Sequence, residues 1–178
     1  MNRRRFLMTS AQIALGLLLS TAPIDCFAKR IDYHPLTFFH THTGENLQIN
    51  YSPKKGCTFA TQRKVNEFLR DYRTEEVHPI DPKLLELLCK IQLIGGSNGI
   101  YEIISAYRSP ETNHLMHAKS SGVAQNSMHM LGKAIDIRLS DMSTRKIQRI
   151  ATLLRGGGVG YYAQSDFVHL DTGDFRTW

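Results

Sequence analysis

The sequence predicts a single α+β domain, with a mainly antiparallel sheet and flanking helices. Runs that alternate between apolar and polar residues indicate strands, and runs with helical apolar spacing lie between them. The expected order is two strands, two helices, two strands, one helix and two strands, without the regular strand–helix alternation of a parallel sheet. Of the 178 residues, 42% are hydrophobic and 21% are charged, as is usual for a globular chain with one buried core.

Residues 1–28 have the composition of a cleavable export signal. Arginines at positions 3–5 precede a mostly apolar stretch, and Cys26 and Ala28 provide small residues before a cleavage site. Residues 3–7, RRRFL, fit the core of a twin-arginine signal. Polar residues interrupt the apolar stretch, which disfavours a membrane span. We expect a periplasmic domain at 29–178, with a general secretory signal or a retained N-terminal anchor as open alternatives.

The charge of the chain argues against a nucleic-acid partner. Removal of residues 1–28 takes away three Arg and one Asp and lowers the formal net charge from +6 to +4. This mild positive charge suits an anionic cell envelope, and no cluster of Lys and Arg marks a nucleic-acid surface. Cys57 and Cys89 remain in the mature chain; an oxidising compartment permits a disulfide between them, but their positions in the sequence do not decide it. The sequence does not indicate the oligomeric state.

The first half of the domain begins with a hairpin at residues 36–51, whose turn lies at 43–46. Residues 61–72 have the apolar spacing of an amphipathic helix. A second helix starts at Asp81-Pro82, an N-cap followed by proline in the first turn, and ends at Gly95-Gly96.

In the second half, residues 101–107 form the next predicted strand. Residues 109–128 are polar and predict a long loop, which we expect to select the substrate. A strand at 134–139 and a helix at 143–155 follow. The glycine-rich residues 156–160 lead into the final strands, the last at 166–171.

Alternation in two of these strands indicates a metal site. Asp136 lies on the face opposite Ile135 and Ile137, and His169 lies on the face opposite its apolar neighbours. Together with His129, they provide two imidazoles and one carboxylate, the ligand set of a catalytic zinc ion with an open fourth position.

Three nearby residues have predicted roles in the chemistry. Asp166, three residues before His169, is expected to be the base that takes a proton from zinc-bound water. Arg108, at the end of a strand, is expected to stabilise the oxyanion, although a structural ion pair with Asp136 or Asp171 is also possible. Asp171 shares a face with His169 and is expected to orient a ligand.

The motif Ser127-x-His129-x-x-Gly132-x-Ala134-x-Asp136, followed by Asp166-x-x-His169, resembles the zinc D-alanyl-D-alanine peptidase group, which shares its fold with the hedgehog signalling domain. The segment 105–109 resembles the part of that group that carries its catalytic-site arginine. The likeness covers roughly residues 35–178 and is strongest to exported murein endopeptidases.

The resemblance implies one Zn²⁺ per chain and hydrolysis of peptide cross-links in peptidoglycan, whose stem peptides would be the substrate. Three alternatives remain open at this stage. The bond could be a D,D or an L,D link, the enzyme could be a carboxypeptidase, or the domain could be a zinc-stabilised binding module without activity.

Overall fold

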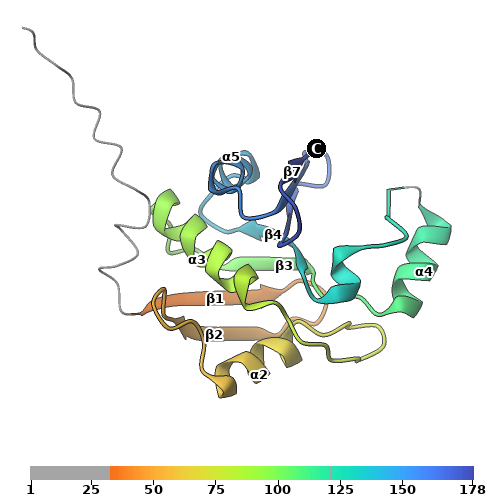
Figure 1. Ribbon diagram of the computed structural model, residues 1–178, viewed down its shortest axis with the longest axis horizontal. Helices are drawn as coiled ribbons and strands as arrows, with labels where there is room; N and C mark the ends of the chain where they lie inside the picture. Colours follow the sequence, from red (N-terminus) through yellow and green to blue (C-terminus); the bar gives the residue numbers. More distant parts are fainter. Residues whose placement is uncertain (1–32, 121) are drawn as a thin grey trace, which may run out of the picture.

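Seven strands form one sheet in the order β2-β1-β3-β4-β6-β5-β7 (Figure 1). The computed structural model describes residues 33–120 and 122–178, so the predicted signal at 1–28 lies outside the described residues. Most neighbouring strands are antiparallel, as predicted; the exceptions are the β1–β3 and β5–β7 pairs, which are parallel. The strands are β1 (His34–His40), β2 (Asn46–Tyr51), β3 (Tyr101–Ser105), β4 (Ala134–Leu139), β5 (Gly158–Tyr162), β6 (Phe167–Asp171) and β7 (Arg176–Thr177).

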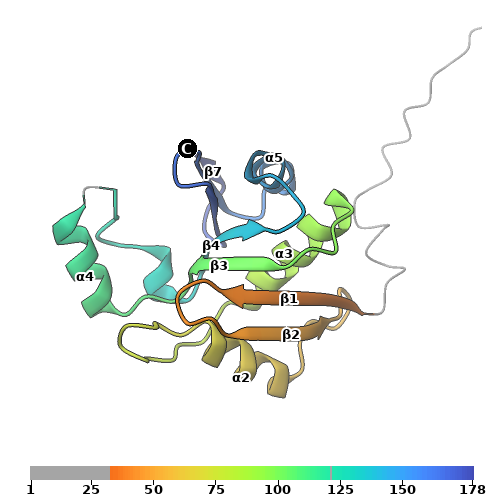
Figure 2. The same cartoon turned by 180° about the vertical axis from the view of Figure 1, so that it is seen from behind.

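Helices α3 (Pro82–Gly95) and α5 (Thr144–Leu154) pack against each other and cover one face of the sheet, whereas the view from behind shows β1, β2 and β3 without a helix over them (Figure 2). Helix α2 (Phe59–Phe68) lies at the β2 edge. The leucines of α3 at positions 84, 85 and 88 are almost fully buried, so this helix provides much of the core.

Local signals set the ends of these helices. The Asp81 carboxylate caps α3 by accepting from the Lys83 backbone N–H at 3.0 Å, and α3 ends at Gly96 with a left-handed φ of 65°. The Ser143 side chain caps α5 in the same way. The predicted helix at 61–72 is shifted, because Thr58 caps α2 and the chain leaves the helix after Phe68.

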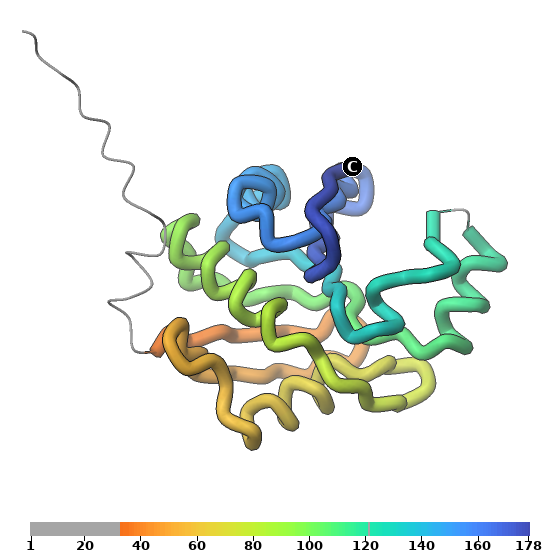
Figure 3. Tube along the Cα trace, in the orientation of Figure 1, coloured from red at the N-terminus to blue at the C-terminus, as the bar shows by residue number. Residues whose placement is uncertain are grey.

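The prediction of a loop throughout 109–128 is wrong. Ser109 caps a ten-residue helix, α4 (Pro110–Lys119), and a short 3-10 helix, η1 (Met128–Leu131), follows. In Figure 3 the chain leaves β3, runs outward through α4 and returns through η1 to β4. The excursion therefore places its returning end beside the centre of the sheet.

The sequence left open whether Cys57 and Cys89 form a disulfide. Cys57 and Cys89 are both free thiols, so the structure has no disulfide between them. Within residues 33–120 and 122–178, no helix is both long enough and apolar enough to cross a membrane.

Candidate metal centre

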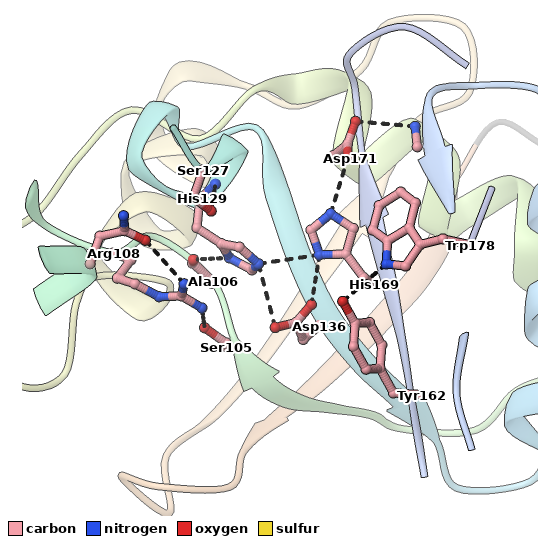
Figure 4. Close-up of polar contacts among 12 residues, drawn as sticks. Ser105, Ala106, Arg108, Ser127, His129, Asp136, Tyr162, His169, Asp171 and Trp178 are labelled. Atoms are coloured by element: carbon pink, nitrogen blue, oxygen red, sulfur yellow. Dashed lines mark hydrogen bonds and ion pairs between the residues drawn. The ribbon is translucent and has the colours of Figure 1, made fainter. Parts of the chain in front are cut away.

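Three side chains from separate parts of the sequence converge on the face of the sheet opposite α3 and α5 (Figure 4). His129 lies in η1, and Asp136 and His169 are directly paired residues of β4 and β6. Their ligand atoms lie within 4.8 Å of one another. The Nδ1 of His169 is 2.9 Å from Asp136 Oδ1, and His129 Nε2 is 3.4 Å from Asp136 Oδ2. The structure thus brings the three predicted ligands together.

The alternation of β4 and β6 explains how two of these ligands are held. Ile135 and Ile137 are fully buried beneath the helices, which directs Asp136 to the other face. Val168 is likewise fully buried, and His169 projects opposite to it. Burial of the apolar face fixes the register, since a shift of one residue would turn every side chain over.

The residues around His129 in the sequence motif have structural roles. Ser127 caps η1, its hydroxyl accepting from the His129 backbone N–H at 3.3 Å. Gly132 ends η1 with a φ of 62°, and a Cβ at this position would collide with the carbonyl oxygen of Pro79. These constraints place His129 beside the end of β4.

Each imidazole is oriented by a hydrogen bond from its outer nitrogen. His129 Nδ1 donates to the carbonyl oxygen of Ala106 at 2.6 Å, and His169 Nε2 donates to Asp171 Oδ2 at 3.0 Å. Because both partners are acceptors, the outer nitrogens are the donors, and a metal ion that replaces the proton between His169 and Asp136 would meet the lone pairs of the inner nitrogens. Metal-binding histidines commonly have this arrangement.

The position of Asp171 agrees with its predicted orienting role. Its carboxylate is fully buried and also accepts from Arg176 Nη2 at 2.6 Å. The backbone N–H groups of Gly158 and Gly173 donate to its other oxygen, at 3.1 and 2.9 Å. Burial opposes ionisation of Asp171, but these hydrogen bonds outweigh it and hold the pKa of the carboxyl well below its usual range.

The ionisation of Asp136 and His169 favours a cation at the centre of the triad. Burial would raise the pKa of Asp136, but the neighbouring His129 and His169 hold it well below its usual value. Burial would lower the pKa of His169, but its hydrogen bonds to Asp136 and Asp171 raise it to about 9. A positive charge between the inner nitrogens and the carboxylate is therefore favoured. Two imidazole nitrogens and one carboxylate oxygen fit the ligand set of catalytic zinc.

Arg108 lies beside the triad, across His129 from His169 (Figure 4). Arg108 is 6% exposed, and its guanidinium donates to Asn113 Oδ1 at 3.2 Å and Ser105 Oγ at 3.3 Å. Burial lowers the pKa of Arg108, and Asp136 partly opposes this effect. None of the described carboxylates forms a salt bridge with it, so the structural ion pair considered from the sequence is not present. A buried cation without a counter-ion suits the binding of an anionic group.

The structure does not bring Asp166 to the triad. Asp166 is exposed in the turn between β5 and β6, and its carboxylate accepts from Thr144 Oγ1 of α5 at 2.7 Å. Asp166 lies before β6 with a left-handed φ of 49°, and this turn directs its side chain to Thr144 instead of the triad. The expectation that Asp166 is the base conflicts with this placement. Among the described residues lining the central cavity, the ligand Asp136 is the sole carboxylate.

A cavity of about 250 Å³ opens over the triad. Six residues of 122–128 and Met116 of α4 form part of its wall, so the stretch predicted to select the substrate does reach the site. Tyr162 and Trp178 form part of the opposite wall. Alternation allows Tyr162 to face the cavity, but no local pattern indicated Trp178. A larger cleft of about 860 Å³ beside α2 contains none of the predicted site residues.

Comparison with known proteins gives matches over nearly the whole chain. The profile of a family described as "Peptidoglycan L,D-endopeptidase MepK" matches residues 29–178. A Haemophilus influenzae protein named "Probable peptidoglycan L,D-endopeptidase MepK" is 40% identical over 99% of this chain and 95% of its own length. The Escherichia coli K12 protein named "Peptidoglycan L,D-endopeptidase MepK" is 37% identical over 98% of this chain and 96% of its own length. No solved structure matches the chain.

Proposed function

Since this chain belongs to the family of peptidoglycan L,D-endopeptidases described as MepK, a group of metallopeptidases, we propose that it uses zinc to hydrolyse L,D cross-links between diaminopimelate residues of peptidoglycan. The zinc proposal rests on the triad of His129, Asp136 and His169. Its three ligand atoms converge within 4.8 Å, and hydrogen bonds orient both imidazoles. The L,D specificity is taken from the names of the relatives.

His129 Nε2, His169 Nδ1 and one carboxylate oxygen of Asp136 would hold the ion. When bound, zinc would polarise the scissile carbonyl and lower the pKa of a coordinated water to about 7. The Ala106 carbonyl and Asp171 keep the two imidazoles in the tautomers that leave these nitrogens free. They also limit ring rotation, which preserves the geometry between turnovers.

Arg108 would stabilise the negative charge that develops on the carbonyl oxygen during attack. Its guanidinium is already desolvated, held by Ser105 and Asn113 and without a carboxylate partner. A preorganised cation in a buried site needs little rearrangement when charge develops. This placement favours the catalytic role over the structural one.

We further propose that the enzyme acts in the periplasm, with residues 1–28 as a twin-arginine signal and 29–178 as the peptidase domain. The basic start of the chain and the small residues before position 29 support this proposal. The family match begins at residue 29, directly after the proposed cleavage site. Peptidoglycan as the substrate requires export to the same compartment.

The test is digestion of purified sacculi that contain both L,D and D,D cross-links, followed by separation of the muropeptides. We expect L,D-linked dimers to become monomers while D,D-linked dimers persist. His129→Ala should abolish cleavage, because it removes a ligand. His114→Ala is the matched control, since His114 is exposed on α4 outside the triad, and should behave like the wild type. Persistence of L,D-linked dimers with fully metallated wild type would refute the proposal, as would selective loss of D,D-linked dimers.

A further inference from the structure

Tyr162 and Trp178 form a hydrogen-bonded pair at the wall of the metal cavity (Figure 4). We propose that the Tyr162 hydroxyl donates a hydrogen bond to the scissile peptide group during hydrolysis, and that Trp178 positions this hydroxyl. The proposal rests on the proposed function, and it makes Tyr162 a second hydrogen-bond donor of the site, in addition to Arg108.

Strand alternation directs Tyr162 into the cavity. The preceding residue, Tyr161, lies on the helix face, where the Arg145 guanidinium of α5 is 5.4 Å from its ring centroid. Tyr162 therefore faces the same side of the sheet as His169. Its ring stacks on Phe167 with a centroid distance of 4.5 Å, which restricts its rotation. In Figure 4 its hydroxyl points toward the His169 and Asp136 side of the site.

The backbone holds Trp178 against β5. Its N–H donates to the Val159 carbonyl at 3.2 Å, and its carbonyl accepts from the Tyr161 N–H at 2.9 Å. The indole covers Gly160, where a Cβ would lie only 2.6 Å from the ring. A glycine is therefore needed beneath the indole. The ring centroid of Trp178 is also 5.3 Å from that of His169, so the indole lies next to a ligand.

The direction of the hydrogen bond leaves the phenolic proton available. An indole N–H can only donate, so Trp178 Nε1 must donate to Tyr162 Oη, at 3.0 Å. Within the described part of the chain, this is the only hydrogen bond of the hydroxyl. With one lone pair engaged by the indole, the O–H group has an unused donor directed at the cavity.

The position of this donor complements Arg108. Arg108 lies on one side of the triad and Tyr162 on the other, so a carbonyl held over the triad has a donor on each side (Figure 4). Hydrogen bonds that strengthen as charge develops on the carbonyl oxygen lower the barrier to attack. A role in the transition state should reduce kcat with little effect on KM.

The main variant is Tyr162→Phe, which keeps the stacked ring and removes only the hydroxyl. Tyr161→Phe is the matched control, because it removes the neighbouring hydroxyl on the helix face. The substrate is a purified L,D-linked muropeptide dimer. We expect Tyr162→Phe to lower kcat about 100-fold while KM changes less than about threefold. Its zinc content and thermal midpoint should match those of wild type, and Tyr161→Phe should retain wild-type kinetics.

The positioning role of Trp178 is tested by a double-mutant cycle. Trp178→Phe removes the indole donor and should lower kcat about tenfold, the cost of one misplaced hydrogen bond. In the Tyr162→Phe background it should have no further effect, because Trp178 acts through the missing hydroxyl. Independent structural roles would instead give additive losses, which would overturn the positioning claim.

Fluorescence provides a readout that needs no turnover. Trp178 is the only tryptophan of the chain, so intrinsic emission reports on this position alone. In metal-free protein, Tyr162→Phe should shift the emission and Tyr161→Phe should not. Unchanged emission in Tyr162→Phe would contradict the paired geometry. If the wild type is active and Tyr162→Phe keeps full kcat, the inference about Tyr162 is wrong and the proposed function stands. If the metallated wild type is inactive, the proposed function is wrong as well.

Discussion

Replacement of Asp171 by Asn tests how the protein orients its metal ligands. The substitution keeps the shape of the side chain but removes its charge and turns one acceptor into a donor. In the structure the carboxylate accepts from His169 Nε2 at 3.0 Å and from Arg176 Nη2 at 2.6 Å on the same oxygen. Two backbone N–H groups already occupy its other oxygen. The new NH₂ group must therefore face a donor whichever way the amide is turned.

The contacts set the expected size of this effect. Breaking a fully buried ion pair from one side costs about 3–5 kcal/mol. The Arg176 side chain is 46% exposed, so water replaces part of its lost interaction. We expect the free energy of unfolding of the metal-free protein to fall by about 2–3 kcal/mol. Loss of the bond to His169 should weaken zinc binding about 10- to 100-fold.

Two measurements separate these effects: denaturant unfolding of the metal-free protein and competition for zinc with a chromophoric chelator. Asp174→Asn is the matched control, because it removes the same charge from an exposed side chain three residues away. This control should leave both quantities near their wild-type values. Equal zinc affinity in the Asp171 and Asp174 variants would refute the claim that Asp171 orients His169.

Three further predictions address other groups. Asp166→Asn should keep the wild-type rate on L,D-linked dimers, because Asp166 bonds to Thr144 on the helix side; a loss of turnover with zinc still bound would restore its role as base. Arg108→Lys should lower kcat about 100- to 1,000-fold without releasing zinc, and a wild-type rate would exclude the oxyanion role. Burial opposes ionisation of Asp71, but hydrogen bonds from Thr112 and Ser109 hold the pKa of its carboxyl below the ordinary value. Asp71 therefore stabilises the fold above about pH 4, and this stabilisation is lost as the pH falls. The free energy of unfolding of Asp71→Asn should fall less steeply with decreasing pH than that of the wild type. An equal slope in the two proteins would contradict this role of Asp71.

The sequence predicted the sheet and the positions of two candidate metal ligands, Asp136 and His169, because strand alternation depends on a buried apolar face. Ile135, Ile137 and Val168 are fully buried, so Asp136 and His169 had to face the other way. The same rule does not apply to Asp166, which lies in the turn before β6 with a left-handed φ of 49°. The prediction for Asp166 followed the sequence motif, which does not show that the turn directs this side chain to Thr144.

Helix α4 and the position of Trp178 could not be predicted from the periodicity of apolar residues. Helix α4 has no apolar stripe, and its buried residues include the polar Thr112 and Asn113, so only the cap at Ser109-Pro110 signals a helix. Trp178 reaches the site through the parallel pairing of β7 with β5, a long-range contact without a local pattern. Apolar alternation therefore predicts the site residues on amphipathic strands, but it does not predict a residue such as Trp178, which long-range strand pairing brings to the site.

Anomalous diffraction at the zinc edge, from crystals of the purified protein grown with zinc, would show whether the triad holds the ion. We expect one peak per chain, about 2.0–2.2 Å from His129 Nε2, His169 Nδ1 and an oxygen of Asp136. This peak should be absent in His129→Ala and present in His114→Ala. A peak held by other residues, or no peak at the triad of the wild type, would show that the triad is not the zinc site.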